Sequence, residues 1–450
     1  MQTGDILEVS VISLSSSGEG ISKPDGFVVF IDGGCPGDIL KIKIEHVTKQ
    51  FAKASVVEII KPSKHRVEPF CPLQKVCGAC QLQFIDYDYQ LELKRQIVED
   101  AMTKIGGLNL EIPMPIPSPK TKEYRCKIQY PVSQTKVSKR LLAGYYKKQS
   151  HEIVNIKYCP IQPSICDDII DFIRENAAKY GISGYNEKKH SGDLRHVVIR
   201  HSEINGENLV VLVVNSTKIF GKLKDFAKAI YEKFDNVAGV CVNFNPKHTN
   251  VILGKVTECL AGKDFVEEKL LDKTFKIGAG TFFQVNPKAA ENIFKYVRDY
   301  IKKNFRNPVV LDSYAGISTF GICVADVCSQ VVSVEENSES CALAKATAEY
   351  NNIKNIEINN MDAGKFASQE KRKFDCIILD PPRKGCTEQS LDEALRLCKN
   401  TIIYVSCNPA TLARDLKYLA EKGAKVESVQ PFDMFCHTYH IEDVAIIKLR

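Results

Sequence analysis

Cys407 lies where a predicted buried strand gives way to a helix. The strand covers residues 401–406, and helix-forming residues begin near Ala410. We therefore expect the thiol at the carboxyl edge of a sheet, beside a helix N-terminus that would lower its pKa and make it a better nucleophile. Because most cysteines are inert core residues, simple packing is the alternative interpretation.

A second group of reactive side chains follows, in the segment Phe432-Asp-Met-Phe-Cys-His-Thr-Tyr-His-Ile-Glu-Asp. His437, His440, Glu442 and Asp443 stand between two apolar runs, which favours a site over a core. A metal centre is the alternative, but the spacing matches no standard zinc pattern.

Two further strands end in residues suited to a cofactor. Gly316 permits a tight turn after the strand that begins at Val309, and Glu335 ends the next strand, where an acidic group can bind ribose hydroxyls. The glycine pattern that a pyrophosphate needs is absent, so a cofactor without phosphates, such as S-adenosylmethionine, fits better than NAD. Asp380 ends another apolar strand, and the two prolines after it would fix the carboxylate at the same edge.

A thiol, a carboxylate and a methyl donor together predict one reaction. C5 of uracil is a poor nucleophile, but a thiolate that adds to C6 makes it nucleophilic. C5 then accepts the methyl group, a base removes the C5 proton, and elimination frees the thiol.

The elements that must position these groups lie in the last third of the chain. From about residue 273 to 450, apolar strands alternate with helical patterns, which predicts a doubly wound α/β domain with a mostly parallel sheet. The last two strands have no helix between them, so we expect them to pair as an antiparallel edge.

The rest of the chain predicts two more domains. Residues 1–61 contain short strands separated by Gly and Pro turns, which is typical of a small β-barrel of the oligonucleotide-binding type. Residues 62–272 mix strands and helices and include a predicted helix over 86–105. Basic and aromatic residues interleave near 120–127, a composition suited to RNA but equally to a solvated loop.

Composition adds weaker constraints. A net charge of +6 permits a polyanionic partner without requiring one. No signal peptide or membrane span is visible, so we expect a cytoplasmic protein with no membrane partner. In a reducing compartment, 17 cysteines are not a disulfide framework, and some should be metal ligands or catalytic thiols.

Several motifs together resemble the RNA (uracil-5-)-methyltransferase family that carries an iron–sulfur cluster and a TRAM domain. They are the cysteine segment 71–80, Phe-Phe-Gln-Val-Asn at 282–286, Asp-Pro-Pro-Arg at 380–383 and Ser-Cys-Asn-Pro-Ala-Thr-Leu-Ala-Arg-Asp at 406–415. The resemblance spans nearly the whole chain. It implies an N-terminal OB-like TRAM barrel that binds RNA, a central α+β domain with the cluster, and a C-terminal Rossmann-like class I methyltransferase domain.

The resemblance also implies roles for individual residues. Cys407 would be the nucleophile and Glu442 the base. The residues expected to bind S-adenosylmethionine are Gln284, Tyr314, Glu335 and Asp380, with Asp362 as a further candidate.

The same resemblance assigns Cys71, Cys77, Cys80 and Cys159 to a [4Fe–4S] cluster. Four thiolates suit zinc equally well, and spacing alone would favour zinc; the resemblance is what favours the cluster. The chain departs from the usual pattern at Ser318, where glycine is usual.

The expected activity is methylation of a uridine in RNA to 5-methyluridine by a monomeric enzyme. Large-subunit (23S) ribosomal RNA is the first expectation for the substrate and transfer RNA the second. RNA cytosine-5 methylation, a non-catalytic RNA-binding assembly factor and a redox sensor are the alternative functions.

Overall fold

The computed structural model describes residues 1–449, which form two compact units. Unit 1 comprises residues 1–74, residues 80–118 and the chain from Ala363 onward, and unit 2 comprises residues 75–79 and 119–362. Neither unit is one continuous stretch of sequence. The predicted domains 1–61, 62–272 and 273–450 do not coincide with the two units, and that division stays a prediction.

The first sixty residues form a six-stranded sheet curled around one apolar core in unit 1. The strand order is β1-β5-β6-β4-β3-β2. In β5, buried Leu40 and Ile42 alternate with exposed Lys41 and Lys43, so one face lines the core and the other meets solvent. This matches the predicted small barrel. The elements are β1 (Ile6–Ser10), β2 (Ser13–Leu14), β3 (Gly20–Ser22), η1 (Pro24–Gly26), β4 (Val28–Asp32), β5 (Ile39–Val47) and β6 (Phe51–Lys61).

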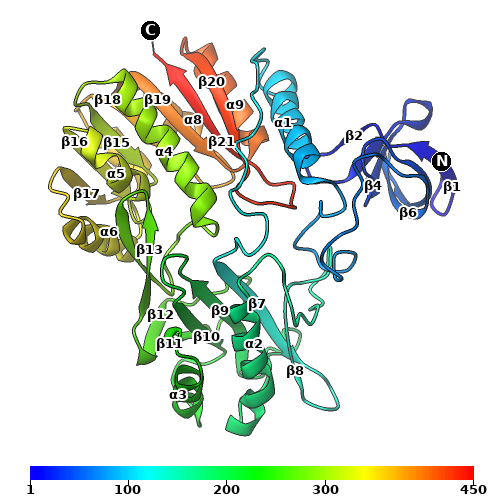
Figure 1. Cartoon of the computed structure of the whole chain (residues 1–450). Helices are drawn as coiled ribbons and strands as arrows, with labels where there is room; N and C mark the ends of the chain where they lie inside the picture. Colours follow the sequence, from blue (N-terminus) through cyan, green and yellow to red (C-terminus); the bar gives the residue numbers. More distant parts are fainter. Residues whose placement is uncertain (450) are drawn as a thin grey trace. The chain divides into compact units, whose positions relative to one another are not determined.

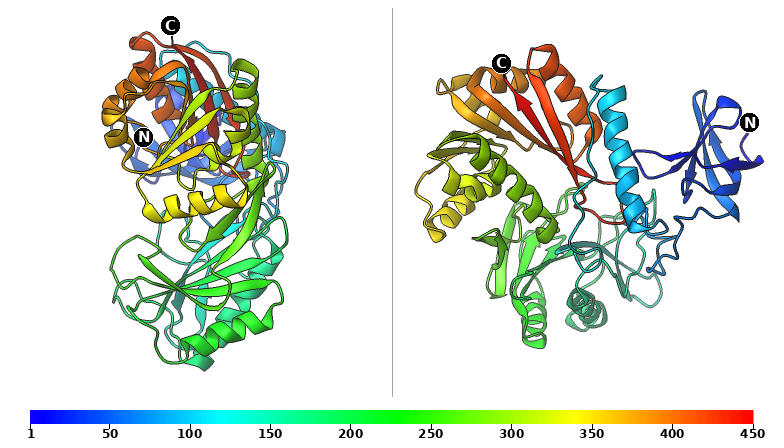
Figure 2. Two further views of the ribbon diagram at one scale, coloured as in Figure 1. Left: turned by 90° about the vertical axis from the view of Figure 1, so that its left-hand side faces the viewer. Right: turned by 45° about the horizontal axis from the view of Figure 1, so that its top comes forward.

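Helix α1 (Tyr87–Lys104) packs against both the barrel and α9 (Pro409–Glu421) within unit 1, as Figures 1 and 2 show. Its first turn is capped by Asp86, whose carboxylate accepts a backbone N–H at 2.9 Å. Leu14 of the barrel and Leu93 of α1 share one buried apolar cluster. The helix predicted over 86–105 is therefore confirmed to within one residue at each end.

Unit 2 contains a second six-stranded sheet with the order β12-β11-β10-β9-β7-β8, followed by the hairpin β13–β14. Every residue of β10 is buried, as expected of a central strand. The strands are β7 (Lys127–Gln134), β8 (Leu141–Ala143), β9 (Leu194–His201), β10 (Asn208–Val214), β11 (Val237–Phe244), β12 (Val256–Gly262), β13 (Phe265–Leu270) and β14 (Lys273–Gly278). The helices are α2 (Ser164–Asn176), η2 (Ala177–Tyr180) and α3 (Leu223–Lys233).

The remaining part of unit 2 alternates strand and helix. Strands β15 and β16 are parallel, and β16 and β17 are parallel as well. The elements are α4 (Pro287–Asn304), β15 (Val309–Ser313), α5 (Thr319–Val324), η3 (Ala325–Val327), β16 (Gln330–Glu335), α6 (Ser338–Tyr350) and β17 (Ile356–Asn360).

The C-terminal part of unit 1 continues the alternation. Its strand order is β18-β19-β21-β20, with β18 parallel to β19 and β21 antiparallel to both β19 and β20. The predicted antiparallel pairing of the last two strands is confirmed, although β21 is an inner strand and only β20 lies at the edge. The elements are α7 (Ala363–Gln369), β18 (Phe374–Leu379), α8 (Glu388–Leu397), β19 (Cys398–Ser406), α9, β20 (Lys425–Phe432) and β21 (Glu442–Lys448).

No helix within residues 1–449 combines the length and the apolar character that crossing a lipid bilayer requires.

Candidate functional site

Cys407 directly follows β19 and is partly buried. The next residue, Asn408, caps α9, since its side-chain oxygen accepts the backbone N–H of Ala410 at 3.1 Å. Ser406 is buried, and its hydroxyl accepts the backbone N–H of Asn408 at 3.2 Å. The turn around the thiol is thus fixed on both sides, and the predicted placement between strand and helix is confirmed.

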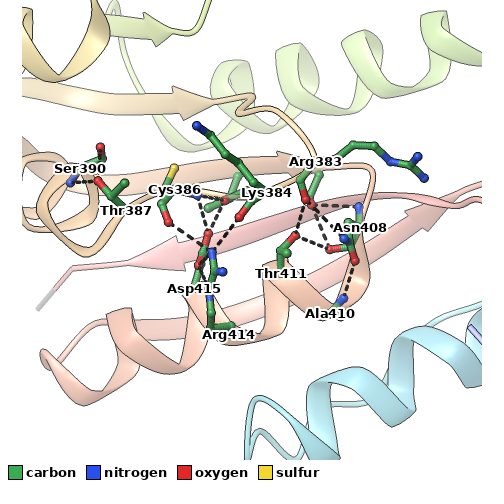
Figure 3. Close-up of polar contacts among 12 residues, drawn as sticks. Arg383, Lys384, Cys386, Thr387, Ser390, Asn408, Ala410, Thr411, Arg414 and Asp415 are labelled. Carbon is green, nitrogen blue, oxygen red and sulfur yellow. Dashed lines mark hydrogen bonds and ion pairs between the residues drawn. The ribbon is translucent and has the colours of Figure 1, made fainter. Parts of the chain in front are cut away.

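The loop that follows β18 is fastened to the start of α9, as Figure 3 shows. The backbone oxygen of Arg383 accepts hydrogen bonds from the side chains of Asn408 at 3.3 Å and Thr411 at 3.2 Å. The segment that carries Asp380 is therefore tied to the turn that carries Cys407.

Asp415 is the centre of a second set of bonds between the same two segments (Figure 3). Its buried carboxylate accepts the N–H of Cys386 at 2.8 Å and the hydroxyl of Tyr404 at 2.6 Å. Arg414 pairs with Asp415 and also donates to the backbone oxygen of Lys384 at 3.0 Å.

Gly385 is required in this loop. Its φ is +76°, and a Cβ there would lie 2.6 Å from the Asp415 carboxylate. Glycine at this position thus allows the loop to pass close to the Asp415 carboxylate.

Asn408, Thr411 and Asp415 were not predicted from the sequence to have a role of their own. Their spacing was the available signal, because positions three, four and seven residues apart share one face of a helix. These polar side chains of the motif fasten the loop after β18 to the helix that follows the thiol.

The pKa of the Cys407 thiol is raised to about 11, so the expectation of a lowered pKa is wrong. Burial is the largest cause, and the nearby carboxylates of Glu442 and Asp380 add to it, while Arg383 opposes them. Two acidic neighbours and burial outweigh the favourable end of α9. The structure thus brings Cys407, Glu442 and Asp380 together, as the sequence predicted. Their surroundings raise the pKa of the thiol, whereas a lowered pKa was expected.

Glu442 is the first residue of β21, and its pKa lies well above the usual range. Burial is again the main cause, followed by the charges of Asp380 and Asp443, and Arg383 acts in the opposite direction. The guanidinium of Arg383 also lies 2.8 Å from Nδ1 of His440. One cation thus lies beside a thiol, a carboxyl group and an imidazole.

The predicted contacts to S-adenosylmethionine in unit 2 include the turn after β15. Tyr314 has a φ of 63° and Gly316 a φ of 57°, so the chain turns sharply there. The carboxylate of Glu335 accepts the N–H of Gly316 at 2.9 Å and that of Asn337 at 2.8 Å. Glu335 therefore fixes the turn and lies at the end of its strand, as expected for a ribose ligand.

Asp312 lies beneath this turn and is 1% exposed. Its Oδ2 accepts the N–H of Gly321 at 2.9 Å, and its Oδ1 has no hydrogen-bond partner within residues 1–449. Burial raises its pKa to about 7. Ser318, at the position where the resemblance expects glycine, has a φ of 57° and shares a hydrogen bond of 2.6 Å with Ser333. The serine thus keeps the glycine-like backbone.

Gln284 lies in the loop between β14 and α4, also in unit 2. The backbone oxygen of Val285 accepts the N–H of Cys126 at 2.7 Å, and buried Arg200 donates to the backbone oxygens of Ala279 and Thr281. These bonds hold the loop against the second sheet. Asp362 is exposed and follows β17, as predicted.

The four cysteines assigned to the cluster divide between the units, with Cys71 and Cys80 in unit 1 and Cys77 and Cys159 in unit 2. All except Cys71 are buried. Across residues 1–449, no three or more His, Cys, Asp or Glu side chains are grouped so that they could hold a metal ion. The predicted [4Fe–4S] cluster is therefore not supported by this finding and stays a prediction.

The chain is similar to known RNA-modifying proteins over almost its full length. The family described as tRNA (uracil-5-)-methyltransferase matches residues 247–449, and the TRAM domain matches residues 1–57. A protein of Halalkalibacterium halodurans described as an RNA methyltransferase is 37% identical over 450 residues, which cover 99% of this chain and 97% of the relative. One of Thermosynechococcus vestitus, described in the same way, is 36% identical over 448 residues, with 99% and 98% covered.

Among solved structures, the tRNA (uracil-54, C5)-methyltransferase of Pyrococcus abyssi, in complex with S-adenosyl-L-homocysteine, matches with a TM-score of 0.78 and 26% identity. The match covers 98% of this chain and 100% of that chain.

Proposed function

The chain belongs to the RNA (uracil-5-)-methyltransferase family and depends on S-adenosylmethionine, and from this premise we propose that Cys407 is its covalent nucleophile and Glu442 its base. The observation that carries the proposal is the electrostatic contact of the thiol with Glu442, Asp380 and Arg383 at the end of β19. The family match also removes the non-catalytic assembly factor as an alternative.

In the proposed reaction, the Cys407 sulfur adds to C6 of the target uracil, and the ring electrons move onto C5 and O4. S-adenosylmethionine, which Gln284, Tyr314, Glu335 and Asp380 would hold, would supply the methyl group that C5 accepts. Glu442 then takes the proton from C5, the C5–C6 double bond re-forms, and the C6–sulfur bond breaks. Elimination releases a thiolate, which regains its proton from solvent, and the products are 5-methyluridine, S-adenosylhomocysteine and the proton held by Glu442.

The raised pKa values set a condition on this reaction. With a pKa of about 11, the Cys407 thiol is protonated in the resting enzyme at neutral pH. The proton must therefore pass from sulfur to solvent as the bond to C6 forms, and Glu442, whose pKa is also raised, must lose its own proton before it can accept the one from C5. Arg383 is the neighbouring cation that favours the ionised forms of both Cys407 and Glu442.

RNA that carries 5-fluorouridine tests the nucleophile. Fluorine replaces the proton that the base removes, so the enzyme should stop as a stable protein–RNA adduct. We expect this adduct from the natural protein and none from Cys407→Ala, which should still bind S-adenosylmethionine. Methylation by Cys407→Ala would overturn the assignment of the nucleophile.

The Glu442→Gln variant tests the base. It should transfer the methyl group to ordinary RNA and then accumulate the methylated adduct, because elimination needs the lost carboxylate. Normal turnover by this variant would place the base elsewhere.

We propose ribosomal RNA as the substrate, following the family resemblance. Transfer RNA is the second candidate, because the similar Pyrococcus abyssi enzyme acts on uracil 54 of tRNA. Incubation of the purified protein with unmodified transcripts of each class, followed by nucleoside mass spectrometry, separates them. Appearance of 5-methyluridine only in tRNA would move the substrate and leave the mechanism unchanged.

We further propose the [4Fe–4S] cluster on Cys71, Cys77, Cys80 and Cys159. The support is the chemistry of the donors, four cysteines of which three are buried. Protein purified without oxygen should contain about four irons and absorb in the visible range. One tightly bound zinc, or no metal at all, would exclude the cluster.

A further inference from the structure

The segment between β20 and β21, residues 433–441, is here called the base loop, because Glu442 follows it directly. We propose that α1 is a brace for this loop and that Tyr87, Gln90 and Lys94 are positioning residues for Glu442. The proposal rests on the assignment of Glu442 as the base.

The central contact is an ion pair between Lys94 and Asp433. Their charged atoms are 2.6 Å apart, and both side chains are fully inaccessible to solvent. Lys94 also donates to the backbone oxygen of Phe435 at 3.1 Å. One ammonium group on α1 thus holds the base loop at two points.

Tyr87 completes the environment of Asp433. Its hydroxyl donates to the second carboxylate oxygen of Asp433 at 2.8 Å and accepts the N–H of Ser118 at 3.0 Å. Side chains of α1 therefore bind both oxygens of the buried Asp433 carboxylate.

Gln90 holds the middle of the base loop. Its side-chain oxygen accepts the N–H of His437 at 3.1 Å, and its amide donates to the backbone oxygens of Leu82 and Ile85 at 3.1 and 2.8 Å. The backbone oxygen of His437 in turn accepts the N–H of Leu82 at 2.8 Å.

The backbone of His437 needs this support. Its φ is 65°, a conformation that costs energy for any residue with a Cβ and persists only where surrounding contacts enforce it. The loop then continues through Thr438, whose hydroxyl accepts the N–H of His440 at 3.2 Å, two residues before Glu442.

These three side chains lie on one face of α1, because they are spaced three and four residues apart. A buried ion pair is a poor device for stability alone, since apolar residues of similar volume often stabilise a core as well or better. Unlike an apolar contact, the ion pair fixes the distance and direction between Lys94 and Asp433. We infer that its role is to maintain the geometry of the base loop.

The test compares Lys94→Met with Lys104→Met. Lys104 is on the same helix, but its pair with Asp100 is exposed, at 69% and 64% for the two side chains. Since a displacement of about 1 Å can cost about 100-fold in a chemical step, we expect Lys94→Met to lower turnover of ordinary RNA by about 10- to 100-fold. Lys104→Met should turn over like the natural protein.

The step that slows distinguishes positioning from general damage. Lys94→Met should still form the adduct with 5-fluorouridine RNA, which does not need the base, and should accumulate methylated adduct on ordinary RNA. Turnover without adduct accumulation, at the rate of the Lys104→Met control, would overturn the proposal. Failure of the natural protein to form the 5-fluorouridine adduct would instead overturn the proposed mechanism.

Two further variants keep the test decisive if Lys94→Met unfolds. The double variant Lys94→Met with Asp433→Leu removes both buried charges and should recover thermal stability. It should nevertheless remain slow in elimination, and recovery of turnover along with stability would show that the pair is only structural. Tyr87→Phe keeps the ring, loses one bond to Asp433 and should show the same accumulation in milder form; natural behaviour of this folded variant would also refute the brace.

Discussion

Replacement of Glu335 by glutamine should weaken the binding of S-adenosylmethionine far more than a surface change of the same kind. The carboxylate now accepts two backbone N–H groups, from Gly316 and Asn337, and is expected to accept the ribose hydroxyls as well. Glutamine offers one acceptor oxygen and places an N–H₂ group against one of those donors. Hydrogen bonds to a charged group contribute about 1.5–3 kcal/mol each. A net loss of about 3 kcal/mol corresponds to a rise of about 150-fold in Kd.

Isothermal titration calorimetry with S-adenosylmethionine and with S-adenosylhomocysteine measures this change. Glu336→Gln is the matched control, since Glu336 is the adjacent residue and is exposed. Its Kd should stay at the natural value. A change of less than about threefold in Glu335→Gln, or under about 0.7 kcal/mol, would refute the assignment of Glu335 as both turn support and ribose ligand.

Three other outcomes follow from the buried polar groups. In the folded protein Asp312 has a pKa of about 7, so between about pH 4 and 7 it binds more protons in the folded state than in the unfolded state. Its contribution to the free energy of unfolding is therefore present at low pH and is lost as the pH rises. Between pH 4 and 8, the free energy of unfolding of Asp312→Asn should therefore gain about 4 kcal/mol relative to that of the natural protein, as measured by thermal unfolding at each pH. Parallel curves of stability against pH for the two proteins would contradict this. Tyr404→Phe removes a hydrogen-bond donor to buried Asp415 and should lower the free energy of unfolding by about 2 kcal/mol. The control Tyr418→Phe removes an exposed hydrogen bond and should cost under about 0.5 kcal/mol. Equal effects of the two variants would refute the role of Asp415 in holding the loop. Finally, kcat/KM should rise with pH from about 6 to 9, because the Cys407 thiol is largely protonated throughout; a flat profile would show that ionisation of the thiol does not limit the reaction.

Local patterns in the sequence were sufficient to predict most of the elements that carry the site. The helix over 86–105, the strand before Cys407 and the helix after it all depend on short-range periodicity and capping, and all three are present. The position of β21 between β19 and β20 was not predictable in the same way. Strand order depends on which distant segments pair, and an apolar run gives no sign of its neighbours.

The site was predictable in its residue types and not in its electrostatics. The sequence indicated that Cys407 and Glu442 would come together, but it could not give the depth of burial. Burial is the largest cause of the raised pKa at both groups, so the sign of the thiol's shift was inaccessible from spacing alone. Asp415 and Lys94 were missed for a related reason, since each acts through a partner distant in the chain.

The raised pKa of the nucleophile indicates which step of the proposed reaction is opposed by charge. The charge of Glu442 disfavours the thiolate of Cys407, and because such coupling is reciprocal, a thiolate disfavours the ionised form of Glu442. Two adjacent negative charges are thus avoided in the resting enzyme. The sulfur is uncharged as the resting thiol and again once it is bonded to C6, so the opposition between the two negative charges arises only while the thiolate forms. In the proposed mechanism, formation of the thiolate is therefore the step that burial and the charge of Glu442 disfavour, and Arg383 is the neighbouring cation that favours it.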